Sequence, residues 1–299
     1  MSPLPFDLPA AFLAHAERDE KWAAWVDSVP GRVAHALEAW DLVVDGVPTH
    51  GPTALAVPVT TEGRPAVLTT GWPFDESRQE WLALRQWDGR GAVRLLRADP
   101  AANVLLLERL HGTDLLSLGA LEACEVVAGL YGQLHVPAPA RLDRLSDAVT
   151  RWTDDLAALP RSLPFPRRMV EQAIHLGRAL AGDADTDGTL VHTDLRDENV
   201  LAADRAPWLA IGSRPLSGDA HYEPAPMLSN RWDEVLAARD PRSAVRRRFH
   251  TLVDVAGLDE QRARDWVVVR EAHRAMWAIE DSEAGRVTAA VTIIKAVQD

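Results

Sequence analysis

Lysine is almost absent from this sequence of 299 residues: it occurs only at Lys21 and Lys295, near the two ends. A site that depends on a lysine in the middle of the chain is therefore excluded. The one cysteine, Cys124, excludes an internal disulfide framework, and the apolar helical pattern around it predicts a buried core thiol. The H-E-x-x-H and C-x-x-C spacings that indicate metal centres do not occur either.

Long hydrophobic runs and an excess of basic residues are also missing. No apolar run reaches the roughly 18 residues that a membrane span needs, and residues 1–9 show neither the basic nor the apolar region of a signal peptide. The formal net charge is −12, which disfavours nucleic acid and anionic membrane surfaces and favours cationic ligands. We therefore expect a cytoplasmic protein that binds neither nucleic acid nor membranes.

The feature that organises the sequence is a polar loop between two apolar runs. Residues 190–191 and 207–211 are apolar and predict two short buried strands, and His192, Asp194 and Asn199 lie between them. We expect these polar side chains to gather at one end of the strands. The hydrophobic fraction of 47% is ample for a core, and the length allows one large domain or two lobes.

Hydrophobic periodicity predicts the remaining elements, with Pro30 and Gly31 as a break inside the first helical segment. The first part of the chain should contain two helices within residues 9–38, a hairpin of residues 53–60 and 64–70, a helix over residues 75–87, and strands over residues 93–96 and 104–107. The later part should contain helices over residues 121–134, 145–159, 168–181, 244–255, 259–281 and 286–297.

Residues 192–199 read H-T-D-L-R-D-E-N, which resembles the H-x-D-L-x-x-x-N catalytic loop of small-molecule kinases. The continuation N-V-L-A-A-D-R-x-P-W-L-x-I, then P-L-x-G-D, is similar to the aminoglycoside phosphotransferase family, in its branch of streptomycin 6-phosphotransferases and hydroxyurea phosphotransferases. The resemblance implies an α+β, protein-kinase-like bilobal fold. A small β-rich N-lobe (residues 1–108, helices plus an antiparallel sheet) would precede a large helical C-lobe (residues 109–299), which carries the catalytic-type loop at residues 190–213.

In this family the loop Asp accepts the substrate hydroxyl proton and the loop Asn holds a metal ion, and the resemblance assigns these roles to Asp194 and Asn199. Other positions depart from the family. Gly212 stands where the family has an Asp that binds the nucleotide's metal, and Thr69 stands where it has a Lys that grips the phosphates. Glu80 resembles the helix Glu that pairs with that Lys. Thr69, Glu80 and Gly212 thus predict a degenerate, pseudokinase-like nucleotide site with no metal bound.

The leading hypothesis from these departures is a repurposed, cyclase-like enzyme of secondary metabolism and antibiotic biosynthesis. It would act on a small amine-bearing metabolite without phosphoryl transfer and without a cofactor. Asp194 would be the base of an intramolecular displacement that closes a ring and expels an anionic leaving group. The substrate-binding candidates are Asp197 or Glu198 for a second cationic group, Asn199 to position the chain, Arg196 for the leaving group, Trp277 to exclude water, and Glu280 and Asp281 as an acidic wall.

Two alternatives stay open. One is an ATP-dependent phosphotransferase of the aminoglycoside or hydroxyurea type, which would confer antibiotic resistance and use ATP and Mg. The other is a non-catalytic pseudokinase that binds a ligand or a partner protein. The expected partner in each case is a small cationic or amine-bearing molecule, with a companion protein as a further option. In the loop itself, crowding of Asp194, Asp197 and Glu198 should raise the pKa of one of these carboxylates.

Overall fold

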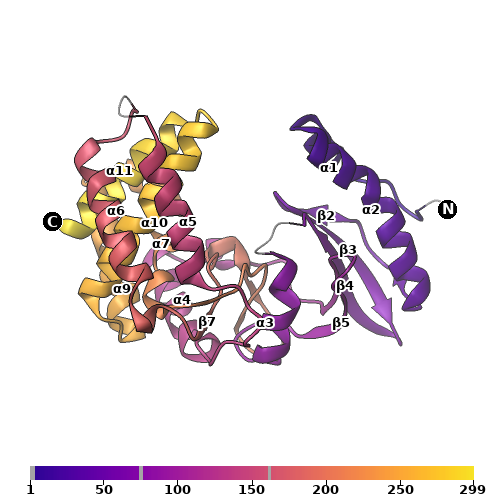
Figure 1. Ribbon diagram of the computed structural model, residues 1–299. Coiled ribbons are helices and arrows are strands. Elements are labelled where there is room, and N and C mark those ends of the chain that lie inside the picture. Colours follow the sequence, from indigo (N-terminus) through magenta and orange to yellow (C-terminus); the bar gives the residue numbers. More distant parts are fainter. Residues whose placement is uncertain (1–3, 74–76, 161–162) are drawn as a thin grey trace. The chain divides into compact units, whose positions relative to one another are not determined.

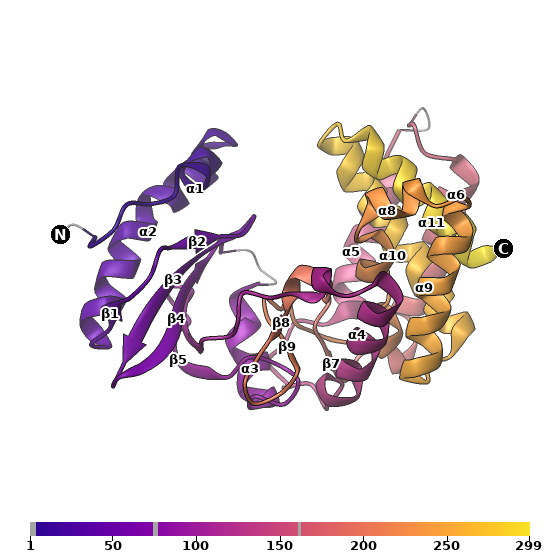
Figure 2. The ribbon, with the colours of Figure 1, turned by 180° about the vertical axis from the view of Figure 1, so that it is seen from behind.

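The computed structural model describes residues 4–73, 77–160 and 163–299 and divides into two compact units (Figures 1 and 2). The first unit, Met1–His111, contains an antiparallel sheet with helices, and the second unit, Gly112–Asp299, is mainly helical. A small β-rich part followed by a larger helical part is the predicted α+β class, which the structure confirms.

The sheet of the first unit is antiparallel and has the order β1-β3-β4-β6-β5, with β2 also paired to β3. Its strands are β1 (Val43–Val44), β2 (Thr49–His50), β3 (Ala54–Thr61), β4 (Arg64–Gly71), β5 (Leu95–Asp99) and β6 (Val104–Glu108). The predicted hairpin forms from β3 and β4 and turns at Glu62 and Gly63, which both have positive φ, as a tight hairpin turn requires. Alternation along β3 buries Leu55, Val57 and Val59 on one face.

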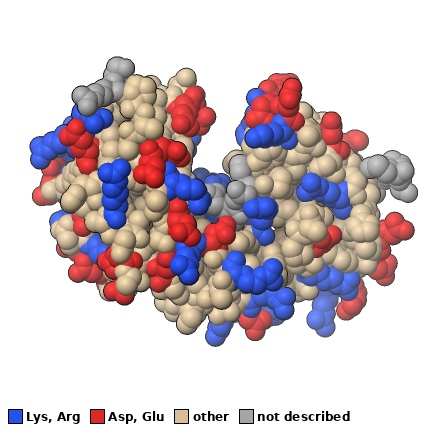
Figure 3. Space-filling model, in the orientation of Figure 1, with Lys and Arg blue, Asp and Glu red and all other residues tan. Residues whose placement is uncertain are grey.

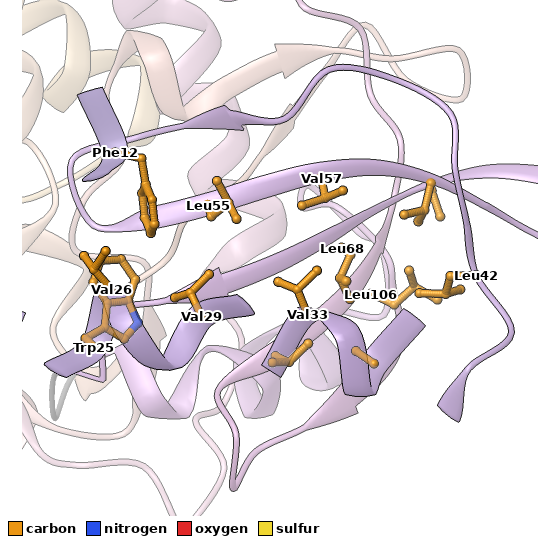
Figure 4. Close-up of a cluster of buried hydrophobic side chains, with 14 of the residues drawn as sticks. Phe12, Trp25, Val26, Val29, Val33, Leu42, Leu55, Val57, Leu68 and Leu106 are labelled. Atoms are coloured by element: carbon orange, nitrogen blue, oxygen red, sulfur yellow. The ribbon is translucent and has the colours of Figure 1, made fainter. Parts of the chain in front are cut away.

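Helix α2 (Glu20–Ala39) covers this buried face. Figure 4 shows Val29 and Val33 of α2 directed at sheet residues such as Leu55 and Leu106. The predicted break at Pro30 and Gly31 is wrong, because α2 runs through Pro30 without interruption. The physical reason is that apolar residues before and after Pro30 form one continuous stripe, and its burial on the sheet outweighs the loss of one helical hydrogen bond.

The chain breaks earlier, at Asp19. Its carboxylate accepts the backbone N–H groups of Lys21 (2.8 Å) and Trp22 (2.9 Å) and so starts α2. The other helical segments of this unit are α1 (Ala10–Leu13), the 3₁₀-turns η1 (Ala14–Glu17) and η2 (Ser77–Gln79), and α3 (Glu80–Trp87). The last of these matches the predicted helix of residues 75–87, whose first two residues lie outside the described part of the chain.

Helices make up most of the second unit. They are α4 (Ala120–Leu134), α5 (Leu145–Ala158), α6 (Arg167–Ala181), α7 (Ala225–Ser229), α8 (Trp232–Ala237), α9 (Pro241–Ala256), α10 (Glu260–Glu280) and α11 (Ala284–Gln298). The helices predicted for this part are all present within a few residues of their predicted ends. Helices α7 and α8 were not predicted, because each is too short to show a helical period. Cys124 of α4 is fully buried, as expected, and burial raises the pKa of its thiol to about 12.

A buried carboxylate, Asp219, joins the strands of the second unit to α10. It accepts hydrogen bonds from Arg262 Nε (2.6 Å), Trp266 Nε1 (2.7 Å) and His221 Nδ1 (2.6 Å). Burial alone would raise the pKa of Asp219, but the hydrogen bonds from His221, Trp266 and Arg262 outweigh burial and lower it to about 2. The apolar side chains packed in this region include Leu145, Val149, Leu180, Val191, Leu216, Tyr222, Trp266 and Val269. Strand β7 (Thr189–Val191), which leads into the polar loop, is thereby anchored in a core.

The surface carries charges of both signs. Figure 3 shows acidic and basic side chains interspersed over each unit on the face drawn. In the described part of the chain, none of the helices has the length and apolar character needed to cross a membrane.

Candidate active site

The polar loop leaves β7 and reaches β8 (Val200–Ala202) through the 3₁₀-turn η5 (Asp197–Asn199). Strand β7 pairs with β10 (Leu216–Gly218), and β8 pairs with β9 (Trp208–Ala210), both antiparallel. The two apolar runs of the sequence therefore form β7 and β9, as predicted, with the additional strand β8 between them. The loop is held at both ends by paired strands.

His192 is fully buried and fastens the loop to the end of β9. Burial lowers the pKa of His192, which keeps its ring neutral. Nε2 lies 3.0 Å from the carbonyl oxygen of Ile211 and therefore donates, which leaves Nδ1 to accept the backbone N–H of Asp194 at 3.3 Å. One neutral ring thus connects Asp194 to the segment that precedes Gly212.

The residue before the predicted base is held in an unusual conformation. Thr193 has a φ of +62°, in the left-handed region that β-branched residues rarely adopt. The carboxylate of the fully buried Glu223 accepts the backbone N–H of His192 and that of Thr193 (3.2 Å), while Arg270 donates to the carbonyl oxygen of Thr193. The hydroxyl of Thr193 donates to the carbonyl oxygen of Arg214 at 2.6 Å. These bonds hold a conformation that costs about 1–3 kcal/mol and so fix the direction of the loop.

Asp194 and Asn199, which the kinase-like pattern singles out, lie together. Asn199 Nδ2 donates to the backbone carbonyl of Asp194 at 2.7 Å and to its carboxylate oxygen Oδ2 at 3.3 Å. The Asp194 side chain is 20% exposed, so its carboxylate is both positioned and accessible. A carboxylate held in this way can accept the proton of a bound hydroxyl group.

Arginine side chains surround this carboxylate. Arg196 Nε lies 3.7 Å from Asp194 Oδ1, and Arg214 Nε lies 3.7 Å from Oδ2. Arg274 of α10 donates to Glu271 at 2.7 Å; Glu271 is the main cause that raises the pKa of Arg274, and Asp194 adds to it. The site is therefore less acidic than the loop sequence suggested, because its positive charges come from outside the loop as well as from Arg196.

Asp197 and Glu198, either of which was predicted to bind a second cationic group of the substrate, have different environments. Asp197 is buried, and Arg231 Nε donates to its Oδ2 at 2.5 Å. Burial is the main cause that raises the pKa of Asp197, with Arg231 opposing it, so carboxylate crowding is a minor cause. Glu198 is exposed and accepts from Asn230 Nδ2 at 3.2 Å. Asp197 therefore makes an internal ion pair, and its predicted contact with a substrate cation stays a prediction.

Trp277, Glu280 and Asp281 lie at the exposed end of α10, beyond Arg274 on the same helix. The ring of Trp277 packs edge-on against Trp152, with the ring centroids 5.4 Å apart. Within the described residues, none of the three contacts Asp194 through a hydrogen bond or an ion pair. Their predicted roles in excluding water and forming an acidic wall stay predictions.

Thr69 and Glu80 belong to the first unit. Thr69 is half-buried in β4, opposite Ala56 of β3 and Leu105 of β6. Glu80 is half-buried at the first position of α3. The strand position where the resemblance implies a lysine is thus an ordinary sheet position with a short polar side chain.

The residues present do not fit the carboxylate-held metal ion that the resemblance implies. Gly212 is exposed with a φ of +66°, and a Cβ added there would lie 3.5 Å from Asn199 Oδ1. The position that would supply a carboxylate opposite Asn199 therefore supplies none. Among the described residues, no group of three or more His, Cys, Asp and Glu side chains is placed to hold a metal ion. The remaining carboxylate, Asp194, is flanked by guanidinium groups.

Sequence reasoning missed three residues that hold the loop, namely Glu223, Arg231 and Arg270. Each comes from outside the loop and is paired with it only through the fold. The available signal was a charged residue inside an otherwise apolar segment, such as Glu223 between Tyr222 and Pro224, because such residues are rarely buried without a partner.

A cavity of about 450 Å³ lies elsewhere in the second unit, beside α8, α9 and α11. Its lining residues are Trp232, Leu236, Asp240, Pro241, Arg242, Arg246, Thr288, Thr292 and Asp299. None of the predicted site residues lines it, and Arg242 there is paired with Asp299 at 3.1 Å. The loop at Asp194 therefore remains the candidate site.

Comparison with known proteins points to one family. A family model described as aminoglycoside/hydroxyurea antibiotic resistance kinase matches residues 39–282. The chain is 38% identical to a streptomycin 6-kinase of Streptomyces glaucescens over 287 residues, which cover 93% of this chain and 92% of that protein. It is 40% identical to a hydroxyurea phosphotransferase of Kitasatospora aureofaciens over 271 residues, which cover 87% of this chain and 76% of that protein.

The fold has relatives among solved structures as well. An aminoglycoside phosphotransferase solved in a ternary complex with ADP and hygromycin B matches with a TM-score of 0.60 at 16% sequence identity. The match covers 88% of this chain and 97% of that one. At this identity the likeness shows the fold alone, and it confirms the predicted kinase-like architecture.

Proposed function

Because the chain belongs to the aminoglycoside/hydroxyurea antibiotic resistance kinase family, we propose that it transfers the terminal phosphoryl group of ATP to a hydroxyl group of a small polar molecule. The observation that carries the proposal is the accessible carboxylate of Asp194, fixed by Asn199 at the end of a loop with the kinase pattern. Streptomycin and hydroxyurea, named for the relatives, are the first acceptors to test.

The residues of the second unit supply the acceptor side of this reaction. Asp194 takes the proton of the acceptor hydroxyl as the hydroxyl oxygen forms a bond to the terminal phosphorus. The bond from that phosphorus to the oxygen bridging to the next phosphate breaks, and ADP leaves with the electron pair. Asp194 then releases its proton to solvent. Asn199 keeps the carboxylate in place, and His192 and Glu223 keep the backbone of the loop in place.

The expectation of a cyclase-like enzyme that works without phosphoryl transfer is wrong. Relatives that are 38% and 40% identical over most of the chain are named as a kinase and a phosphotransferase. The expectation that no cofactor is needed is overturned by the same relatives, and ATP with Mg²⁺ takes its place. These relatives lend no support to a non-catalytic pseudokinase either.

We also propose that the metal site is degenerate at Gly212, where the chain lacks the carboxylate that the family resemblance implies. The change Gly212→Asp tests it, because Asp tolerates a positive φ better than most residues and its Cβ would be in ordinary contact with Asn199 Oδ1, at 3.5 Å. We expect the variant to need about tenfold less Mg²⁺ for half-maximal activity. An unchanged Mg²⁺ requirement in a folded Gly212→Asp variant would refute the degeneracy.

The acceptor is proposed to be cationic or amine-bearing, in keeping with the net charge of −12 and with the exposed Glu198, Glu280 and Asp281. A cytoplasmic location and a companion protein stay predictions. The test of the function is a coupled assay of ADP release with streptomycin and with hydroxyurea, in which mass spectrometry identifies the product. Addition of one phosphoryl group to an acceptor is the expected result, and ADP release that is independent of every acceptor would count against the proposal.

A further inference from the structure

We propose that Arg196 and Arg214 form a guanidinium clamp for the phosphoryl group that is transferred, and that this clamp replaces the carboxylate-held metal ion for which residue 212 has no ligand. The inference rests on the proposed phosphotransferase function and names how its site binds the donor. The residues present lack the carboxylate of the metal site that the family resemblance implies.

The two arginines lie on the two sides of the Asp194 carboxylate. Each places its Nε at 3.7 Å from a different carboxylate oxygen, which is too long for a hydrogen bond. Arg196 Nε is also 4.0 Å from Glu198 Oε2 and is buried without a hydrogen-bond partner. In the part of the chain that the structure describes, neither guanidinium group makes a hydrogen bond. Both guanidinium groups are thus held near the base by charge, and no acceptor among the described residues takes up their N–H donors.

Other arginines close to the loop are already committed to buried partners. Arg231 is 6% exposed and is bound to Asp197, and Arg270 donates to the carbonyl oxygen of Thr193. Arg196 and Arg214 differ, because their side chains are 37% and 41% exposed. A ligand that approaches Asp194 therefore meets two accessible guanidinium groups.

The chemistry of the transfer needs positive charge at this place. A phosphoryl group in flight spreads negative charge over three equatorial oxygens, and catalysis is mostly positioning and stabilisation of that charge. A guanidinium group offers parallel N–H donors that match two phosphate oxygens at once. With no carboxylate at Gly212 and no lysine in the middle of the chain, the positive charge beside the base must come from arginine. Arg274 is taken up by its hydrogen bond to Glu271 at 2.7 Å, which leaves Arg196 and Arg214.

Calorimetric titration with AMP-PNP and with ADP, at fixed Mg²⁺, tests the clamp without relying on turnover. Only AMP-PNP carries the phosphate that the clamp would hold. In Arg196→Gln and Arg214→Gln, AMP-PNP affinity should fall by about tenfold or more for each charge-assisted hydrogen bond that is removed, while ADP affinity should stay within about twofold. Arg178→Gln on α6 removes a guanidinium group that is more exposed, at 63%, and is paired with Asp154 at 3.9 Å, and this variant should change neither affinity.

The outcomes separate the clamp from the function. If the wild-type chain binds neither nucleotide and phosphorylates no acceptor, the proposed function fails and the clamp fails with it. If the wild-type chain phosphorylates an acceptor but both arginine variants bind AMP-PNP as tightly as it does, the clamp alone is refuted. An equal loss of AMP-PNP and ADP affinity also refutes it, because the arginines would then hold the inner phosphates or the fold.

A second variant tests the replacement directly. Adding Gly212→Asp to the Arg196→Gln, Arg214→Gln double variant supplies a carboxylate opposite Asn199. AMP-PNP binding should then recover, and the recovery should require Mg²⁺. Failure of AMP-PNP binding to recover at any Mg²⁺ concentration in this folded triple variant would show that the arginines do not stand in for a metal ligand.

Discussion

Glu223→Gln is the most informative perturbation of the loop, because Glu223 is fully buried and its carboxylate accepts hydrogen bonds from the backbone N–H groups of His192 and Thr193. Burial would raise the pKa of Glu223, yet His135, His192 and Arg270 outweigh burial and lower it. The surroundings therefore stabilise the ionised carboxylate. Glutamine keeps the shape of the side chain but removes its charge. It also replaces one carboxylate oxygen, an acceptor, by an amide NH2 group, a donor that faces the backbone N–H donors of the loop.

The magnitude follows from the bonds affected. A hydrogen bond to a charged group contributes about 1.5–3 kcal/mol, and an unsatisfied buried donor costs about 1–3 kcal/mol. Allowing for the smaller desolvation of a neutral amide, we expect Glu223→Gln to lower the free energy of unfolding by about 2–4 kcal/mol. Activity should fall as well, because the positive φ of Thr193, +62°, loses the acceptor that holds it.

Urea denaturation at pH 7, followed by tryptophan fluorescence, measures the free energy of unfolding. The matched control is Glu234→Gln, since Glu234 is 56% exposed and its ion pairs with Arg231 and Arg248 are long, at 3.6 and 3.7 Å. The control should lose no more than about 1 kcal/mol. If the Glu223 variant is as stable as the control, with an unchanged dependence on urea, the role assigned to Glu223 is refuted.

Two further predictions concern buried charges. The pKa of Asp219 is lowered to about 2 in the folded protein, so its ionised carboxylate stabilises the fold fully above about pH 4. This stabilisation, about 2 kcal/mol, is lost as the pH falls through about 2. Measuring the free energy of unfolding of the wild type and of Asp219→Asn across that pH range checks this, and parallel dependences on pH would contradict it. Arg231→Met should cost about 3–5 kcal/mol, because Asp197 is left buried without its partner, whereas the double change Arg231→Met, Asp197→Leu should recover most of the loss in the same unfolding experiment.

The parts of the fold that the sequence predicted are those fixed by local periodicity. The helical spacing of apolar residues in α10 and the alternation of apolar and polar residues in β3 can each be recognised in a dozen residues of sequence. The same is true of the polar loop between two apolar runs. At Pro30, burial of both halves of α2 on the sheet outweighed the local signal for a break in the helix.

The candidate site was predictable only in part, for a related reason. Asp194 and Asn199 are five positions apart and are recognisable as a pair. The partner of Asp197 is 34 positions away, so its burial and its ion pair could not be read from the loop. Thr69 and Gly212 predicted a change of chemistry, which the similarity of most of the chain to a kinase and to a phosphotransferase contradicts. The positive charge beside Asp194 comes partly from Arg214, which approaches it only in the folded structure.

The most direct test of the central claim compares the wild-type chain with Asp194→Asn, which keeps the shape of the side chain and removes the base. Phosphorus NMR would follow ATP, Mg²⁺ and either streptomycin or hydroxyurea. The account predicts a new phosphate ester and ADP with the wild type, and a rate lower by about 10²–10⁴-fold in the variant, with AMP-PNP binding retained. Equal rates of ester formation in the two proteins, or no ester from either acceptor with the wild type, would contradict it.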